Sequence, residues 1–119
     1  MTAKITIIDD DDAVRDSMLS LLESYGYNVT GYASAEDFLR QPRDGVDCLL
    51  LDYHMPGMSG LDLLEQLRSS GDQTPALMIT GRTDPTIESR ANRIPVTLVQ
   101  KPVVEGQLVR WIERTLGRA

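Results

Sequence analysis

Three aspartates stand where two short apolar runs end. Asp9 and Asp10 close the run that begins at residue 4, and Asp52 closes an apolar run over residues 46–51. Converging carboxylates repel one another, and a divalent cation relieves that repulsion. Hard oxygen ligands with room for water suit Mg²⁺, with Mn²⁺ as the alternative ion. An aspartate beside such an ion can act as a nucleophile toward a phosphoryl group, which is the chemistry this pattern indicates.

Thr80 and Lys101 end two later apolar runs and add a hydroxyl and an ammonium group. A phosphoryl group in transfer has three equatorial oxygens that need positive charge or hydrogen-bond donors. The metal ion can serve one oxygen, Lys101 another and Thr80 a third. Gly81 leaves room beside the phosphate and offers a backbone N–H. Together these residues predict a site in which Asp52 accepts a phosphoryl group.

These residues come together only if the apolar runs form one sheet. Short apolar runs alternate with helical patterns, the runs at residues 4–9, 28–32, 46–51, 76–80 and 96–100, the helices at 14–25, 36–40, 61–67, 84–92 and 108–116. This alternation predicts an α/β fold, a single doubly wound (βα)₅ domain over residues 1–119. Its five-stranded parallel sheet is expected in the flavodoxin-like order 2-1-3-4-5, with ligands bound beyond the carboxyl ends of the strands.

Local signals support the boundaries of two helices. Asp11 or Asp12 is expected to be the N-cap of the first helix, and Ser34 the N-cap of the second. Gly26 follows the first helix in the usual position for a helix stop.

Composition excludes several classes of function. The 119 residues are 41% apolar and 25% charged, which is typical of one globular domain. The formal net charge of −6 argues against direct nucleic-acid binding, which needs a basic face. We see no signal peptide, and no apolar run approaches the roughly 20 residues that span a bilayer. Cys48, the only cysteine, is expected to be a buried inert thiol in a cytoplasmic protein, and Trp111 and Tyr25 are expected to be packing residues on helices.

Over nearly its whole length the sequence resembles the receiver domains of bacterial response regulators. The resemblance rests on four segments in the order and spacing of that family: Ile7-Ile8-Asp9-Asp10-Asp11, Leu51-Asp52-Tyr53-His54-Met55-Pro56-Gly57-Met58-Ser59-Gly60, Ile79-Thr80-Gly81 and Lys101-Pro102. It implies that Asp52 is the phosphoacceptor and that Asp9 and Asp10 are the acidic pair, with Asp10 a direct Mg²⁺ ligand. The backbone carbonyl of His54 would be another ligand.

The resemblance also implies roles for the later residues. Thr80 would be the switch hydroxyl and Lys101 the phosphate-binding lysine, with Gly81 beside the phosphate. The peptide bond between Lys101 and Pro102 is expected to be cis, which is otherwise rare. His54 and Arg82, two residues after the acceptor and the switch hydroxyl, are expected to set the lifetime of the phosphate.

Two features depart from the family. Many receivers carry Tyr or Phe as a rotameric switch three residues before the lysine, where this chain has Leu98. Residues 84–92 are poor in apolar side chains and are followed by Asn92-Arg93-Ile94-Pro95. We therefore expect the helix at 84–92 to be short, irregular or mobile, and the output surface to be atypical.

The function that the resemblance implies is a phosphorylation-controlled interaction module. A histidine kinase or phosphotransfer protein would phosphorylate Asp52, and the surface of residues 84–92, 96–100 and the last helix would change. The domain would be a stoichiometric acceptor with slow self-dephosphorylation rather than an enzyme. It would bind a target protein, an output domain or, as a homodimer through that same surface, a second copy. The wording of Ser34-Ala35-Glu36-Asp37-Phe38-Leu39 resembles receivers attached to helix-turn-helix domains, whereas the length of 119 residues favours a single-domain regulator.

Two alternatives stay open. A phosphatase of the haloacid-dehalogenase type uses an Asp-x-Asp-x-Thr/Val pattern, which Asp10, Asp12 and Val14 fit superficially. It would make Asp10 the nucleophile, leave Asp52 unexplained and lack room for a cap domain. A pseudo-receiver, folded but never phosphorylated, is the second alternative.

Overall fold

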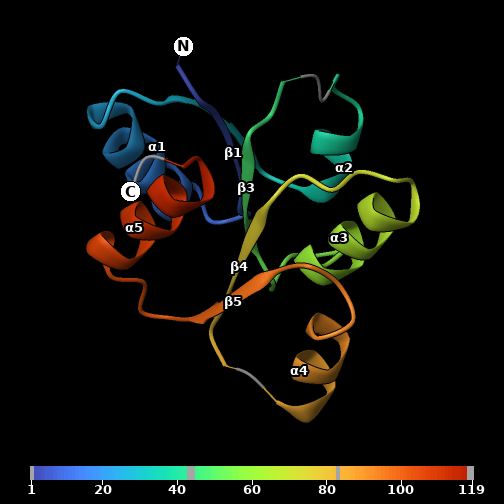
Figure 1. The fold of residues 1–119 in the computed structure, drawn as a ribbon. Coiled ribbons are helices and arrows are strands. Elements are labelled where there is room, and N and C mark those ends of the chain that lie inside the picture. Colours follow the sequence, from blue (N-terminus) through green and yellow to red (C-terminus); the bar gives the residue numbers. More distant parts are fainter. Residues whose placement is uncertain (1, 43–44, 83, 118–119) are drawn as a thin grey trace.

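A computed structural model describes residues 2–42, 45–82 and 84–117. Five strands form one parallel sheet in the order β2-β1-β3-β4-β5, and a helix follows each strand (Figure 1). The predicted order of the strands is confirmed. In chain order the elements are β1 (Lys4–Ile8), α1 (Asp12–Ser24), β2 (Asn28–Tyr32), α2 (Ala35–Leu39), β3 (Cys48–Asp52), α3 (Gly60–Ser69), β4 (Ala76–Thr80), α4 (Pro85–Ala91), β5 (Thr97–Gln100) and α5 (Glu105–Thr115).

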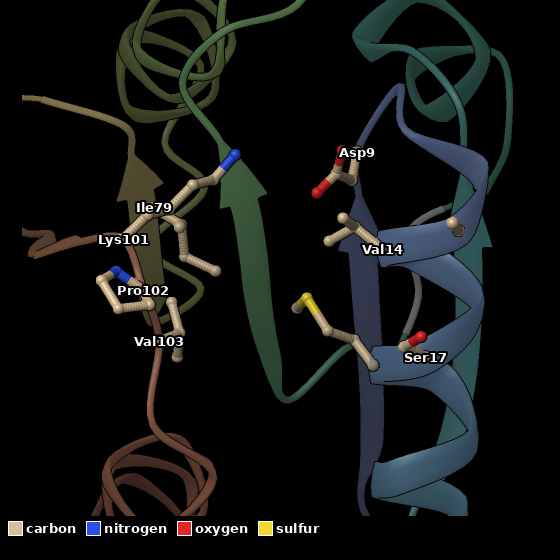
Figure 2. Close-up of a pocket in the computed structure, with 9 residues that line it drawn as sticks. Asp9, Val14, Ser17, Ile79, Lys101, Pro102 and Val103 are labelled. Carbon is tan, nitrogen blue, oxygen red and sulfur yellow. The ribbon is translucent and has the colours of Figure 1, made fainter.

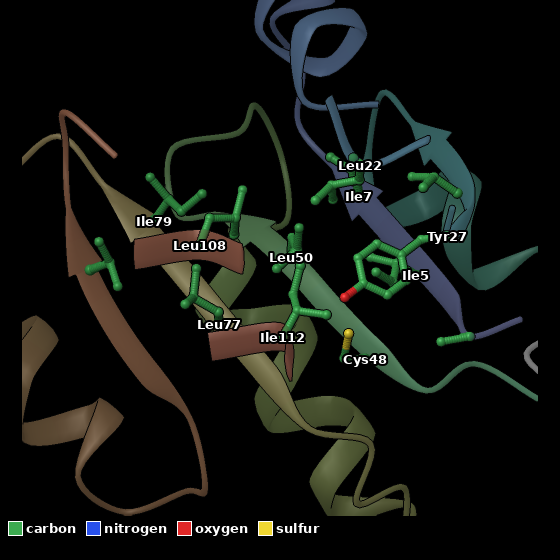
Figure 3. Close-up of a cluster of buried hydrophobic side chains, with 13 residues drawn as sticks. Ile5, Ile7, Leu22, Tyr27, Cys48, Leu50, Leu77, Ile79, Leu108 and Ile112 are labelled. Carbon is green, nitrogen blue, oxygen red and sulfur yellow. The ribbon is translucent and has the colours of Figure 1, made fainter. Parts of the chain in front are cut away.

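The helices divide between the two faces of the sheet, with α1 and α5 on one side and α2, α3 and α4 on the other (Figure 1). Every residue of β3 and β4 is buried, because these strands lie inside the sheet and are covered on both faces. Side chains alternate between the faces along a strand. In β1, Ile7 therefore belongs to the core beneath α1 and α5, and Ile8 to the core beneath α2 and α3. Figure 3 shows the first core, with Ile7, Leu50 and Leu77 from three adjacent strands.

Side-chain caps fix where the first two helices begin. The Asp11 carboxylate accepts a hydrogen bond from the Val14 N–H at 3.1 Å, and the Ser34 hydroxyl accepts one from the Asp37 N–H at 3.0 Å. Both predicted N-caps are confirmed, with Asp11 rather than Asp12 in the first. Gly26 follows α1 with φ of +88°, a left-handed conformation that suits glycine at a helix stop.

The fourth helix is short, as the sequence indicated, but its expected irregularity is wrong. Asp84 accepts a hydrogen bond from the Ile87 N–H at 2.9 Å, and Pro85 occupies the first turn, where its missing N–H costs nothing. Ile87 and Ala91 bury the apolar side of α4. The helix is thus a regular α-helix of seven residues.

The two large aromatic residues of the flanking helices differ in burial. Trp111 is half-buried and packs against the core beneath α1 and α5, as expected. The prediction that Tyr25 is a packing residue is wrong, because its side chain is 47% exposed. Its hydroxyl donates a hydrogen bond to Glu105 at 3.1 Å. This bond, rather than burial, connects the end of α1 to the start of α5.

Cys48 is fully buried, as predicted, and burial raises the pKa of its thiol to about 12. None of the helices in the described ranges combines the length and the apolar character needed to cross a membrane.

Candidate functional site

The predicted site residues meet at the carboxyl edge of the sheet. Asp9 follows the last residue of β1, Asp52 ends β3, Thr80 ends β4 and Lys101 follows β5. Parallel strands in the order 2-1-3-4-5 bring these ends to one edge, at the switch point between β1 and β3. In Figure 2 the side chains of Asp9 and Lys101 extend toward the end of β3 from opposite sides.

The three aspartates form a compact cluster. Asp9, Asp10 and Asp52 each present a carboxylate oxygen, and these oxygens all lie within 4.8 Å of one another. Asp9 and Asp52 are buried, at 3% and 4% exposed, whereas Asp10 is exposed. Burial raises the pKa of Asp9, and the neighbouring charges of Asp52 and Asp10 add to the increase in pKa. The donor set consists of hard carboxylate oxygens with one solvent-facing side, which is what Mg²⁺ or Mn²⁺ requires.

The Asp52 carboxylate lacks full compensation for its burial. The Lys101 Nζ lies 3.3 Å from Asp52 Oδ1. Within the described part of the chain, that oxygen is buried and has no hydrogen bond of acceptable geometry. Burial raises the pKa of Asp52, while the ammonium of Lys101 opposes the increase. A buried oxygen that is under-satisfied and surrounded by negative charge is suited to a cation, so the residues present fit a divalent metal ion.

Arg15 anchors the backbone at Asp9, a role that the sequence analysis missed. Its Nη1 donates to the backbone carbonyl of Asp9 at 2.8 Å, and its Nη2 pairs with Asp12 at 2.5 Å. The Asp9 side chain in turn accepts a hydrogen bond from the Asp11 N–H at 2.9 Å. The spacing of Asp12 and Arg15 on one helix was the available signal. Since Asp12 pairs with Arg15 on α1, the aspartate pair of the phosphatase alternative is not assembled.

Gly60 is the second residue whose role the sequence analysis missed. A Cβ at this position would clash with the backbone carbonyl of Asp52, so only glycine allows the first turn of α3 to approach the acceptor strand. The Gly60 N–H donates to the Tyr53 carbonyl at 3.2 Å, which fixes the approach. Ser59 caps the helix in a capping box with Asp62. The carbonyl clash is a tertiary contact, and the sequence carries no direct signal for it.

Thr80 is fully buried and bonded to its own loop. Its hydroxyl donates to the carbonyl oxygen of Arg82, and the Arg82 N–H lies 3.3 Å from the Thr80 oxygen. The backbone carbonyl of Thr80 accepts a hydrogen bond from the Lys101 N–H at 2.8 Å, which ties the ends of β4 and β5 together. Gly81 follows with an ordinary φ, and a Cβ there would meet nothing within 4 Å.

The remaining predicted residues flank this edge. The peptide bond between Lys101 and Pro102 is cis, as predicted. His54 is exposed and lies edge-on to Tyr53, with ring centroids 4.8 Å apart. Leu98 is half-buried and packs against the core beneath α2 and α3.

Comparison with known proteins places this architecture among chemotaxis-regulator-like domains. Residues 5–113 match the family described as the response regulator receiver domain. The transcriptional regulatory protein FixJ of Azorhizobium caulinodans is 36% identical over 118 residues, which cover 97% of this chain and 56% of FixJ. The response regulator protein TodT of Pseudomonas putida is 39% identical over 117 residues, which cover 97% of this chain and 52% of TodT. A CheY-like receiver domain from Methanospirillum hungatei superposes with a TM-score of 0.91 at 28% identity, covering 98% of this chain and 95% of that one.

The fold and the residues at its carboxyl edge define a receiver-type α/β domain. The chain belongs to the response regulator receiver domain family. Its sequence relatives include transcriptional regulators of two-component systems, and the chain spans about half the length of those relatives.

Proposed function

We propose that Asp52 accepts a phosphoryl group from a histidine kinase or a phosphotransfer protein, and that this changes the protein-binding surface of the domain. One observation carries the proposal. The buried Asp52 forms a cluster with Asp9 and Asp10, and the Lys101 ammonium approaches the same carboxylate to 3.3 Å. A nucleophile, a metal-ligand set and a cation for the phosphoryl oxygens thus converge at one point of the sheet edge.

Metal binding falls to the acidic cluster. Asp9, Asp10 and Asp52 would hold Mg²⁺ or Mn²⁺ through their carboxylates, together with the backbone carbonyl of His54. When bound, the ion neutralises negative charge between the carboxylates and the incoming phosphoryl oxygens. The side chain of His54 stays free of the metal and faces solvent.

Side chains and a backbone N–H at this edge take part in the transfer, with the metal ion bound beside them. A carboxylate oxygen of Asp52 forms a bond to phosphorus while the bond from phosphorus to the donor nitrogen breaks, and that nitrogen keeps the electron pair. Lys101 pairs with one phosphoryl oxygen, and the Thr80 hydroxyl and the Gly81 N–H donate to others. Each domain accepts one phosphoryl group and keeps it on Asp52 as an acyl phosphate. The domain therefore acts as a switch and not as an enzyme.

The downstream partner is a protein. We propose that the surface of α4, β5 and α5 contacts a target protein, an output domain or a second copy as a homodimer. The regulators named among the relatives favour a DNA-binding output domain, with no nucleic acid bound by residues 1–119 themselves. Kinases of this signalling class act in the cytoplasm, which is the location we propose.

Intact-mass measurement tests the acceptor directly. The protein is incubated with acetyl phosphate and Mg²⁺, alongside Asp52→Asn and the matched surface control Asp16→Asn. A phosphoryl adduct is expected on the wild type and on Asp16→Asn, and neither on Asp52→Asn nor after EDTA treatment. Absence of the adduct from the wild type, together with no spectral response to beryllofluoride, would leave a folded pseudo-receiver in place of the switch.

The lifetime of the phosphate provides a second test. His54 and Arg82 are exposed next to the acceptor and the switch hydroxyl, where they can admit or exclude the attacking water. We expect His54→Ala and Arg82→Ala each to change the rate of acyl phosphate hydrolysis, because these side chains flank the path of the attacking water. Unchanged rates in both variants would remove these residues from the proposal.

A further inference from the structure

A groove lies between α1 and the segment that follows β5, and one of its ends meets the acidic cluster (Figure 2). Its volume is about 640 Å³, within the range of pockets that hold small ligands. The apolar residues that line it are Ala13, Val14, Met18, Ile79, Pro102 and Val103. We propose that this α1 groove binds a small amphipathic cation, whose charged group lies at Asp9 and whose apolar body lies between α1 and Val103.

The two walls of the α1 groove suit an apolar body. Val14 and Met18 lie one helical turn apart, so both face the groove from α1. Pro102 and Val103 lie on the opposite wall (Figure 2). Val14, Met18 and Val103 are only partly buried, so a ligand can remove further apolar surface from water. The unbranched thioether of Met18 can adapt to the shape of the ligand.

The charges at the end of the groove favour a cation. Asp9 and Lys101 line this end, and the Lys101 ammonium already lies 3.3 Å from Asp52. Arg15, which is bonded to the backbone of Asp9, has its own charge paired with Asp12 at 2.5 Å. Three carboxylates of the acidic cluster thus stand against one ammonium. This excess of negative charge attracts a cationic group and repels an anionic one.

The acidic cluster also offers acceptor atoms that the protein leaves unused. Within the described residues, the Asp9 carboxylate accepts one hydrogen bond, from the Asp11 N–H to Oδ1. The buried Asp52 Oδ1 has no hydrogen bond of acceptable geometry in the same part of the chain. Carboxylate oxygens of Asp9 and Asp52 lie within 4.8 Å of each other, so one ammonium group can donate to both. These acceptors point to a cationic ligand independently of the shape of the groove.

A ligand in this position competes with the divalent metal ion for the same carboxylates. This consequence rests on the proposed function, in which Asp9 and Asp52 hold the ion. Each of the two ligands lowers the affinity of the domain for the other by the same factor. An amphipathic amine therefore keeps the domain metal-free and slows phosphorylation of Asp52.

Three naphthalene compounds that differ in charge test the α1 groove. Naphthylmethylamine is a cation at pH 7, naphthylmethanol is neutral and naphthylacetate is an anion. In an NMR titration of the metal-free protein, the amine is expected to shift the amides of Val14, Ser17 and Val103 to saturation. The alcohol should bind about tenfold more weakly or worse, because it lacks the charge-assisted hydrogen bonds, and the acid should not bind.

Two exposed serines provide matched variants. Ser17 lines the α1 groove, whereas Ser69 ends α3 on the other face of the sheet. Ser17→Trp fills the groove with an indole and should weaken binding of the amine about tenfold or more, while Ser69→Trp should bind it like the wild type. Ser17→Lys and Ser69→Lys form a second pair, in which only the lysine at the groove should repel the amine.

Competition is measured separately from binding. Mg²⁺ at about ten times its Kd should raise the apparent Kd of the amine about tenfold. The amine should slow formation of the acetyl phosphate adduct on the wild type and on Ser69→Trp, and much less on Ser17→Trp. Adduct formation without the amine tests the proposed function alone, and the metal-free titration tests the groove alone, so the two failures are distinguishable.

Three results would overturn the inference. One is equal affinity for the three naphthalene compounds, which would mean that charge does not select the ligand. Another is unchanged amine binding in both Ser17→Trp and Ser17→Lys, which would place the amine outside the α1 groove. The third is an amine affinity that Mg²⁺ does not alter, which would separate the groove from the acidic cluster.

Discussion

At the Asp52 carboxylate, burial and charge act in opposite directions on one proton equilibrium. Burial and the nearby Asp10 raise the pKa of Asp52, and Lys101 opposes them without cancelling the increase. The folded protein therefore binds this proton more tightly than the unfolded chain does. Below the ordinary value of 3.8 the group is neutral in both states, and the folded state loses stability as pH rises from there through the raised pKa.

This imbalance predicts that Asp52→Asn stabilises the metal-free protein. At pH 7 we expect the free energy of unfolding to rise by about 1 kcal/mol, a normal size for removal of a buried repulsive charge. The gain should shrink as pH falls toward 3.8, because the wild-type carboxyl becomes protonated. Urea denaturation at several pH values, with EDTA present, measures it. A variant less stable than the wild type at pH 7 would contradict the account.

Mg²⁺ should stabilise the wild type more than it stabilises variants of the acidic cluster. Mg²⁺ is expected to raise the thermal midpoint of the wild type, because it binds only the folded cluster, and a saturating excess of about 100-fold over Kd gives roughly 2.7 kcal/mol. Asp10→Asn and Asp52→Asn should lose most of that increase, whereas Asp16→Asn, outside the cluster, should keep it. Calorimetric scans with and without Mg²⁺ provide the comparison, and equal shifts in all variants would refute metal binding at this cluster.

The close contact of Gly60 with the Asp52 carbonyl predicts that a larger residue at this position destabilises the fold, which the sequence alone does not indicate. Gly60→Ala puts a Cβ against the Asp52 carbonyl, and the strain should cost about 1–3 kcal/mol despite the better helix propensity of alanine. Gly81→Ala is the matched control for stability, because nothing lies within 4 Å of its Cβ. Chemical denaturation of both variants is the measurement, and a neutral Gly60→Ala would mean that α3 can shift without loss.

The site residues at strand ends could be predicted from the sequence, whereas the residues that hold them in position, Arg15 and Gly60, could not. Asp9, Asp52 and Thr80 end apolar runs, and parallel strands bring such ends together whatever the details of packing. Arg15 and Gly60 act through contacts with the backbone of other residues. Such contacts depend on how α1 and α3 sit on the sheet, which hydrophobic periodicity does not encode.

At the level of elements, α4 depends on a polar contact for its attachment to α3. Arg90 Nη2 lies 2.8 Å from Asp62 and 2.5 Å from Glu65, and Arg90 Nε donates to Glu65 at 3.2 Å. The fork of one guanidinium thus joins two acids of α3 to the last turn of α4. Its contact with Arg90 and hydrogen bonds at the helix N-terminus lower the pKa of Asp62 below 3.8.

Breaking this contact should loosen α4 before the rest of the fold. Arg90→Ala is expected to cost about 0.5–1 kcal/mol, since the partners are partly exposed and screened by water, and to speed hydrogen exchange of the α4 amides. Stabilisation by the lowered pKa of Asp62 is present above pH 3.8 and is lost as pH falls below it, so the difference from wild type should narrow in acid. Arg93→Ala, at an exposed arginine beyond α4, is the control. Equal exchange in both variants would show that α4 does not depend on Arg90.

The sequence predicted that α4 would be short but not that it would be regular. Few apolar residues in 84–92 indicated weak packing, and only Ile87 and Ala91 are in fact buried. The compensation comes from the Asp84 cap and from Arg90, whose acids lie 28 and 25 residues earlier in the chain. Pairs of residues so far apart in the chain leave no periodic signal in the sequence. The regularity of α4 therefore depends on tertiary contacts that the local pattern does not show.

The molecule as a whole is built from two cores separated by the sheet. Ile7 and Ile8 are adjacent in β1 and fully buried, yet they belong to different cores. The alternation of apolar runs with helical patterns along the sequence was enough to predict a doubly wound parallel sheet and the order of its strands. The groove between α5 and β5, lined by Leu77, Val99 and Trp111 among others, could not be predicted, because it depends on how the helix is placed over the edge strand.

Separate cores predict additive mutational effects across the sheet. Ile7→Val and Ile8→Val should each cost about 0.5–1.5 kcal/mol, and the double variant should equal their sum within about 0.5 kcal/mol. Ile7→Val combined with Leu50→Ala is the contrasting pair, because these residues are register partners in one core and should deviate from additivity. Free energies of unfolding from urea titrations decide between the two patterns. Strong coupling of Ile7 with Ile8 would mean that the sheet transmits strain between its faces.

The hydrogen bond from Thr80 to the Arg82 carbonyl sets a simple rule of exclusion. A hydroxyl carries one proton, so Thr80 can donate to its loop or to a phosphoryl oxygen, but not to both at once. If the Thr80 hydroxyl donates to a phosphoryl oxygen, the Arg82 carbonyl loses this donor and needs another one. Under the proposed function, phosphorylation would therefore move one hydrogen bond of Thr80 from the Arg82 carbonyl to the phosphate, and Thr80→Val, which has no hydroxyl, would remove that exchange.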